Sequence, residues 1–277
     1  MVADATQGQI VRYSPAVGSM AATETLVWKY SGTGPAHPDG LSRDGNGNLY
    51  IVTSKLNDST GNAVWVLPAN PLSPTGFAAA PLLVDASFGS AKGVKTLMET
   101  LIAPTSGPGW SGGDLLVLVG NGSSSGSQNN TNDADVFVYH ATTTLARALA
   151  GTAAAGPDLV LLNPSQFPPG EFPTGFDAWP PGASGSSATI LIATNMGRVL
   201  DYSFGAGLTP SYTVFASGLG SGFNKLRVGA QMGLPVVFVT QSTTSGGRIL
   251  EFGAAGGAPI GIVTTGVNNP DGIAATH

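Results

Sequence analysis

The most constraining feature of this sequence is a glycine followed by an apolar residue, a step that recurs along the whole chain. Successive occurrences are separated by 53, 82, 47 and 50 residues. They are Gly40-Leu41, Gly93-Val94, Gly175-Phe176, Gly222-Phe223 and Gly272-Ile273. Each interval contains short β-branched and aromatic runs broken by Gly, Pro, Ser and Asn. This period predicts an all-β chain built from repeated antiparallel sheets.

The stretch from His37 to Ser54 shows the local pattern most clearly. Leu41 lies in the first short run, and the turn residues Asp44-Gly45 and Asn46-Gly47 follow it. These residues tolerate the positive φ angles that hairpin turns need. The run Leu49–Thr53 is then β-branched and aromatic, as in a strand. We therefore predict two strands joined by a tight turn.

Repeats of four strands, about 40–50 residues long, are typical of β-propeller blades. We predict a single propeller domain over residues 1–277, with five four-stranded blades and with six blades as the alternative. The predicted blades are approximately 1–34 plus 268–277, 35–90, 91–165, 166–218 and 219–267. The 82-residue interval is expected to hold insertions and one short helix at Ala141–Ala150, rather than a sixth blade.

The two ends of the chain are predicted to share one blade. Three strand-like runs lie between Val2 and Tyr30, and the segment Asn269–Ala275 has the pattern of the missing first strand. A ring closed in this way leaves little exposed sheet edge.

Composition limits the function classes. Charged residues are 10% of the chain, the net charge is −5, and the eleven Lys and Arg are scattered, so nucleic acid is not an expected partner. Cysteine is absent, which excludes disulfides and thiolate chemistry. No apolar run is long enough for a membrane-spanning helix. We expect an extracellular or periplasmic protein whose leader or flanking region is not in this chain.

The chain resembles the NHL-repeat and SMP-30/gluconolactonase-like β-propellers. The resemblance lies in "HPDGLSRDGNGNLYIVTS", "VADATQGQIVRYSP" and "NPDGIAA". It implies six blades in a usual member and, in the lactonases, a divalent metal held by a Glu, two Asn and an Asp on inner strands. Glu99 falls on a predicted inner strand without the family's surrounding residues, so we carry over no ligand assignment.

The first strand of each propeller blade lines the central channel. We call the glycine of each repeated glycine–apolar step the anchor glycine, and the residue before each anchor glycine is polar. These residues are Asp39, Lys92, Thr174, Ser221 and Asp271, and two blades carry Asp177 and Asn224 three residues later. The predicted ligand-binding set is Asp39, Asp177, Asn224 and Asp271. These side chains could hold a divalent cation such as calcium at the channel mouth, or hydrogen-bond a sugar or lactone. The alternative is that they only form the polar wall of a water-filled channel and its turns.

Other motifs have simpler interpretations. The G-x-S-x-G match at Gly109–Gly113 lacks the strand-to-helix turn that a hydrolase serine requires. Asp44-x-Asn46-x-Asn48 has calcium-loop spacing, but Lys55 replaces the bidentate Glu, which favours a plain turn. Trp110 and Trp179 lie in Pro/Gly loops and are expected to be the more exposed tryptophans.

No intact catalytic constellation is present in the sequence. The preferred hypothesis is therefore a non-catalytic, secreted or surface-associated binding or structural module with a protein or carbohydrate partner. The alternatives are a metal-assisted lactonase or hydrolase and a subunit of an extracellular assembly.

Overall fold

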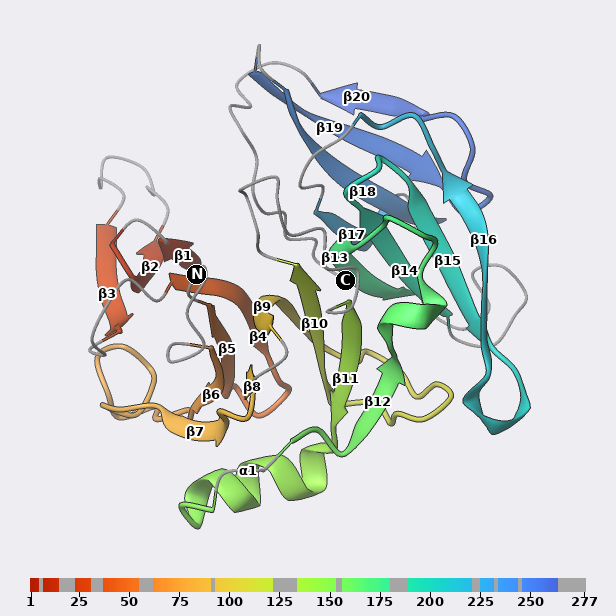
Figure 1. The fold of residues 1–277 in the computed structure, drawn as a ribbon. Helices are drawn as coiled ribbons and strands as arrows, with labels where there is room; N and C mark the ends of the chain where they lie inside the picture. The colour runs from red at the N-terminus through yellow and green to blue at the C-terminus, as the bar shows by residue number, and fades with distance from the viewer. Residues whose placement is uncertain are drawn as a thin grey trace. The chain divides into compact units, whose positions relative to one another are not determined.

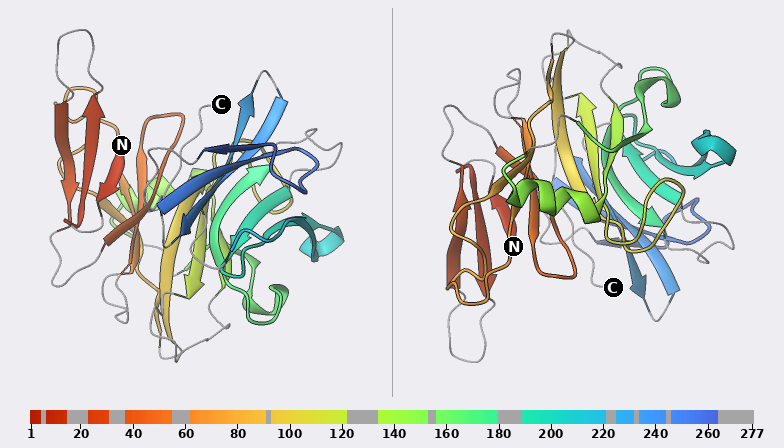
Figure 2. Two further views of the ribbon diagram at one scale, coloured as in Figure 1. Left: turned by 90° about the horizontal axis from the view of Figure 1, so that it is seen from above. Right: turned by 90° about the horizontal axis from the view of Figure 1, so that it is seen from below.

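The structure is a computed structural model, and the regular secondary structure of its described residues is almost entirely β (Figure 1). It describes residues 1–4, 7–14, 23–30, 37–54, 62–90, 93–121, 134–152, 156–179, 189–220, 225–231, 234–243 and 246–263. The chain divides into two compact units, residues 1–102 with 113–160 and residues 103–112 with 161–277. Figure 2 shows the same sheets from above and below.

The first unit begins with a three-stranded sheet of order β1-β2-β3 and a four-stranded sheet of order β4-β5-β6-β7. Their strands are β1 (Val2–Asp4), β2 (Gln9–Ser14), β3 (Thr23–Lys29), β4 (His37–Arg43), β5 (Leu49–Ser54), β6 (Ala63–Leu67) and β7 (Leu82–Asp85). A third sheet has the order β12-β11-β10-β9-β8, and the boundary between the units falls within β12. It contains β8 (Gly89–Ser90), β9 (Gly93–Ile102), β10 (Leu115–Asn121), β11 (Asp135–Tyr139) and β12 (Leu159–Leu162).

The second unit contains two four-stranded sheets in the orders β13-β14-β15-β16 and β17-β18-β19-β20. The first has β13 (Pro173–Trp179), β14 (Thr189–Thr194), β15 (Val199–Phe204) and β16 (Pro210–Ala216). The second has β17 (Leu226–Gln231), β18 (Leu234–Thr243), β19 (Gly246–Gly253) and β20 (Gly261–Val263). Short 3-10 turns, η3 (Pro164–Gln166) and η4 (Ala206–Leu208), lie before β13 and between β15 and β16.

Within each sheet, strands that follow one another in the sequence are neighbours, which is the order within a propeller blade, and pairs such as β4–β5 and β13–β14 are antiparallel. The predicted strands Ala63–Leu67 and Thr189–Thr194 have the same bounds in the structure. The predicted hairpin at 37–54 is β4 and β5, with Leu41 opposite Ile51. The prediction of an all-β chain with four-stranded antiparallel sheets is confirmed.

Within each unit, one strand of a sheet contacts one strand of the next sheet, as the innermost strands of neighbouring propeller blades do. β4 contacts β9 in the first unit, and β13 contacts β17 in the second. Gly40 in β4 permits this approach, because a Cβ built there would lie 2.6 Å from the Cα of Glu99. The sheets therefore have blade-like packing as well as blade-like strand order.

The described residues show four sheets of four or more strands and the small sheet β1-β2-β3. Within the part of the 82-residue interval that the structure describes, there is one sheet rather than two, together with the predicted helix α1 (Ala141–Leu149). The strand predicted at Asn269–Ala275, and hence closure of the ring by both termini, lies outside the described residues.

Strand β5 of the second sheet is buried on both faces, and its alternation shows why. All six residues of β5 are buried. Tyr50 and Val52 join a core shared with β10 and β11, whereas Leu49 and Ile51 join another core with Ile10 of β2. A strand that contacts a core on each face reads as a continuous apolar run, which is the pattern at 49–52.

In the second unit, a core of buried residues lies between its two sheets. Leu191, Val199 and Phe215 from the first sheet pack with Val237 and Phe252 from the second. The rings of Phe215 and Phe252 lie 6.2 Å apart at 63°. This apolar layer holds the two sheets of the unit together.

Helix α1 is the one α-helix among the described residues, and no helix there is long and apolar enough to cross a membrane. Ala148 of α1 is buried in the core that contains Tyr50 and Val52, and the helix contacts β7. Its first turn has no acidic residue, but Asp114 accepts a hydrogen bond from the N–H of Ala141 at 2.9 Å. Asp114 therefore satisfies one of the free N–H groups of the helix start.

Candidate functional site

The structure describes two of the four predicted ligand-binding residues, Asp39 and Asp177. Asp39 lies in β4 of the first unit and Asp177 in β13 of the second, so each is described within its own unit. Asn224 and Asp271 lie outside the described residues.

Asp39 is exposed on the first strand of its sheet. The hydroxyl of Ser54, at the end of β5, donates a hydrogen bond to Asp39 Oδ2. The pairing follows from the hairpin register, which places His37 opposite Ser54 and introduces a bulge near Asp39. An exposed carboxylate at this position can meet a cation or a polar ligand from solvent.

Asp177 is 1% exposed and has a different environment. Its Oδ1 accepts a hydrogen bond from the N–H of Ala178 at 2.8 Å, and its Oδ2 accepts one from the N–H of Val228 in β17 at 2.8 Å. Arg227, the residue before Val228, donates to the carbonyl of Phe176 at 3.0 Å. The carboxylate and the guanidinium therefore connect the first strands of two neighbouring sheets.

Thr174 is also buried. Its side chain is fully buried, and its hydroxyl donates to the carbonyl of Ala193 at 3.2 Å. This polar residue before the anchor glycine of the β13 sheet thus makes a hydrogen bond within its own sheet. Polarity before a glycine therefore does not identify a solvent-facing residue here.

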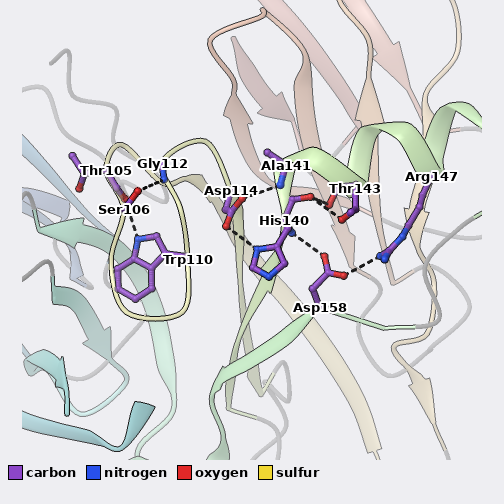
Figure 3. Close-up of polar contacts among 11 residues, drawn as sticks. Thr105, Ser106, Trp110, Gly112, Asp114, His140, Ala141, Thr143, Arg147 and Asp158 are labelled. Carbon is purple, nitrogen blue, oxygen red and sulfur yellow. Dashed lines mark hydrogen bonds and ion pairs between the residues drawn. The ribbon is translucent and has the colours of Figure 1, made fainter. Parts of the chain in front are cut away.

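A second polar group lies where β10, β11 and α1 meet in the first unit (Figure 3). Asp114 is 3% exposed and its Oδ2 lies 2.9 Å from Nδ1 of His140, whose side chain is 44% exposed. Asp158 Oδ2 accepts the N–H of His140 at 2.8 Å, and its Oδ1 pairs with Arg147 at 3.0 Å. The two carboxylates thus hold His140 and the start of α1.

The electrostatics of Asp158 reflect this arrangement. Partial burial pushes the pKa of Asp158 up, but the hydrogen bond from the His140 N–H and the charge of Arg147 outweigh it. The net pKa of Asp158 lies below its usual value, so the carboxylate is ionised at neutral pH. A single imidazole beside a buried carboxylate can orient a proton or one metal bond. Among the described residues, however, no group of three or more His, Cys, Asp or Glu side chains could hold a metal ion.

The loop at residues 103–112 contradicts the expectation that Trp110 is exposed. Trp110 is 4% exposed, its Nε1 donates to the carbonyl of Thr105 at 3.1 Å, and its ring packs edge-on against Phe204 at 5.8 Å. Gly107 lies directly against the indole, where any side chain would overlap the ring. The loop folds around its own tryptophan (Figure 3). The side chain of Trp179 lies outside the described residues.

The Asp44 hairpin confirms the interpretation of Asp44-x-Asn46-x-Asn48 as a turn. Asp44 Oδ1 accepts the N–H of Asn46 at 3.0 Å and that of Asn48 at 2.8 Å. Its Oδ2 accepts from the side-chain amide of Asn48 at 2.8 Å. The carboxylate thus stabilises the turn by local hydrogen bonds.

Sequence reasoning missed the ion pair between the buried Glu171 and the partly exposed Arg198 in the second unit. Glu171 is 5% exposed, its Oε1 bonds the guanidinium of Arg198, and its Oε2 has no hydrogen-bond partner among the described residues. Sequence reasoning also missed the contact of Asp114 and His140. Strand register could have revealed that contact, because the two residues flank the Leu115–Tyr139 pair of β10 and β11.

Comparisons with known proteins give no family. No family model matches the chain, and no curated protein sequence matches it. A solved structure of a proposed exo-beta-1,3-galactanase from Bifidobacterium bifidum is 14% identical, with a TM-score of 0.43 over 78% of this chain and 67% of that one. BBS1N, solved in complex with ARL6DN, is 10% identical, with a TM-score of 0.43 over 97% of this chain and 73% of that one. The assignment of propeller-type sheets therefore rests on the strand order and sheet contacts of the chain itself.

Proposed function

We propose that this chain is a non-catalytic β-propeller that acts as a binding or structural module. The observation that supports the proposal is the position of Asp177. This first-strand carboxylate is almost completely buried and accepts hydrogen bonds from two backbone N–H groups. A carboxylate in this state holds its two strands together and does not face an incoming substrate.

The setting that fits this proposal is extracellular or periplasmic, with a protein or carbohydrate partner. The chain has 10% charged residues and many hydroxyl and amide side chains. Such a chain presents neutral hydrogen-bonding groups, which suit carbohydrate hydroxyls and protein backbones better than polyanions. In the proposed closed ring, five blades surround a central channel, and six remains the alternative.

One observation favours the alternative of a metal-assisted lactonase or hydrolase. Asp39 is an exposed carboxylate on the first strand of its sheet. A divalent cation such as calcium held there could polarise a substrate carbonyl and activate water. The two functions make different predictions for added metal and for Asp39.

The test compares turnover and calcium response in the same purified chain. A panel of lactones and aryl esters is incubated with the protein, with and without Ca²⁺ or Zn²⁺, and thermal unfolding is recorded at each metal concentration. The binding-module proposal predicts turnover equal to that of heat-denatured protein and a Tm that Ca²⁺ does not change.

The contrary outcome is equally specific. Turnover that is proportional to protein concentration, together with a Ca²⁺-dependent rise in Tm that the substitution Asp39→Asn removes, would replace the proposal by the metal-assisted enzyme. A ligand that binds the native state must raise its stability by mass action, so bound calcium would appear in the Tm. Glu24→Gln, an exposed carboxylate on β3, is the matched control.

A further inference from the structure

β16 is an unusual outer strand of its sheet in the second unit. It is seven residues long and pairs with β15 along one edge, and no described strand pairs with its other edge. Ser211, Tyr212, Thr213 and Val214 are exposed one after another, so side chains on both faces of the strand reach solvent. Tyr212 is 40% exposed and Val214 is 49% exposed.

The outer strands of the other sheets are shorter, covered or charged. β7 is four residues long and contacts helix α1, and β12 is also four residues long. β20 has three residues. β3 is as long as β16 but carries Glu24 and Lys29. Natural sheets protect their edges by such devices. In the described residues β16 has protection only at its two ends, where Pro210 has no N–H to donate and the carbonyl of Phe215 accepts the N–H of Gly257, from the loop between β19 and β20, at 2.7 Å.

Charge is missing from a long stretch around β16. Residues 202–224 contain no Asp, Glu, Lys or Arg, although the whole chain has a net charge of −5. Two copies of this protein repel each other overall, but two β16 strands brought together would not add to that repulsion. The strand sequence PSYTVFA is also rich in residues with high β propensity.

The register of β15 and β16 defines which backbone groups face the open edge. The N–H of Gly205 donates to the carbonyl of Thr209 at 2.8 Å, and Tyr202 lies opposite Tyr212. Hydrogen-bonded and non-hydrogen-bonded pairs alternate along antiparallel strands. Counting from Gly205–Thr209, the backbone N–H and C=O groups of Tyr212 and Val214 point away from β15.

We propose that β16 is a self-association edge, at which the β16 strands of two copies pair antiparallel about a two-fold axis through Thr213. In this register Tyr212 of each copy lies opposite Val214 of the other, and each pair exchanges its backbone hydrogen bonds. Aromatic and β-branched residues form favourable cross-strand pairs. The strand is therefore complementary to itself, as a two-fold interface requires. The proposal goes beyond the binding function and does not depend on any channel ligand.

Sedimentation equilibrium of the full chain tests the proposal. A single strand edge buries less surface than a standard protein interface, so dissociation constants of roughly 10 μM to 1 mM are expected. The protein is measured from about 1 μM to 1 mM, a range that brackets such a constant. The expected result is a monomer–dimer equilibrium, and a monomer at every concentration would overturn the proposal.

Substitutions at Thr213 locate the contact. Thr213→Lys places two like charges opposite each other at the two-fold axis, and Thr213→Glu does the same with the other sign. Each variant alone should weaken dimerisation about tenfold or more, because like charges placed against each other in an interface repel strongly. Thr23→Lys adds the same charge to an exposed threonine of β3 and should leave dimerisation unchanged.

Mixing the two charged variants gives the decisive result. An equimolar mixture of Thr213→Lys and Thr213→Glu chains should form a heterodimer at least as tight as the wild-type dimer, because the axis then joins opposite charges. A mixture that stays monomeric overturns the two-fold register. Dimerisation of the Thr213→Lys chain at wild-type strength, or its loss in the Thr23→Lys chain, places the contact elsewhere. Circular dichroism of each variant confirms that it is folded before association is compared.

Discussion

Tyr139 in β11 donates its hydroxyl hydrogen to Asp85 in β7 at 2.7 Å, although 54 residues separate them in the sequence. Both residues are buried, and the other Asp85 oxygen accepts the N–H of Ser87 at 2.8 Å. Burial, followed by the charge and hydrogen bond of Asp85, raises the pKa of Tyr139. The tyrosine therefore stays protonated and remains a donor to the carboxylate.

We expect Tyr139→Phe to lower the free energy of unfolding by about 1–3 kcal/mol, because it leaves a buried carboxylate oxygen without its donor. Urea denaturation followed by tryptophan fluorescence measures the change. Tyr30→Phe is the matched control, since Tyr30 contacts Trp28 through its ring and its hydroxyl has no hydrogen bond in the described residues. Equal losses in the two variants would contradict a special role for the Asp85 contact.

Asp177→Asn tests the connection between β13 and β17. In the Asn variant, an NH2 group replaces one of the two carboxylate oxygens. One of the two backbone N–H groups that donate to Asp177 then loses its acceptor and stays buried. We expect a loss of about 1–3 kcal/mol in the free energy of unfolding, measured by urea denaturation. Asp39→Asn, at an exposed position, should cost less than about 1 kcal/mol. The opposite ranking would mean that Asp177 is not a structural residue.

Gly40→Ala tests the close contact between β4 and β9. The new Cβ would lie 2.6 Å from the Cα of Glu99 and 2.7 Å from the N of Thr100, and both are backbone atoms that cannot rotate away. Overpacking of this kind costs about 1–3 kcal/mol. Gly45→Ala is the matched control, because a Cβ at Gly45 meets no atom within 4 Å. A tolerated Gly40→Ala would show that the two strands can separate at little cost.

The sequence was most informative where structure is local. Strand positions follow from apolar alternation and from turn residues, as at Ala63–Leu67 and Thr189–Thr194. The two-residue strand β8 was not predicted, because two residues carry no periodicity. Helix α1 was predicted from its composition, but its hydrogen bond to Asp114 was not.

Side-chain partners depend on packing between strands and sheets, which a single sequence does not show. Asp177 was predicted to lie at a channel from its place in the repeat, yet its carboxylate contacts Val228, 51 residues away. Trp110 was expected to be exposed because its loop is rich in Gly and Pro. The same glycines let the loop close over the indole, as the contact of Gly107 shows. A polar or aromatic residue in a loop is thus a candidate for function only after its packing is known.

Asp158 predicts a pH dependence of stability in the acid range. Its folded-state pKa is lowered, so it contributes stability that is present above the unfolded pKa of about 4 and is lost as the pH falls through the folded pKa. We expect the free energy of unfolding of the wild type to fall below about pH 4, and the Asp158→Asn variant to show a shallower acid decline. Urea denaturation at a series of pH values measures both curves. Glu24→Gln, on the exposed part of β3, should reproduce the wild-type slope. If Asp158→Asn showed the wild-type slope, the contacts of Asp158 with His140 and Arg147 would contribute nothing to the pH dependence of the free energy of unfolding in acid.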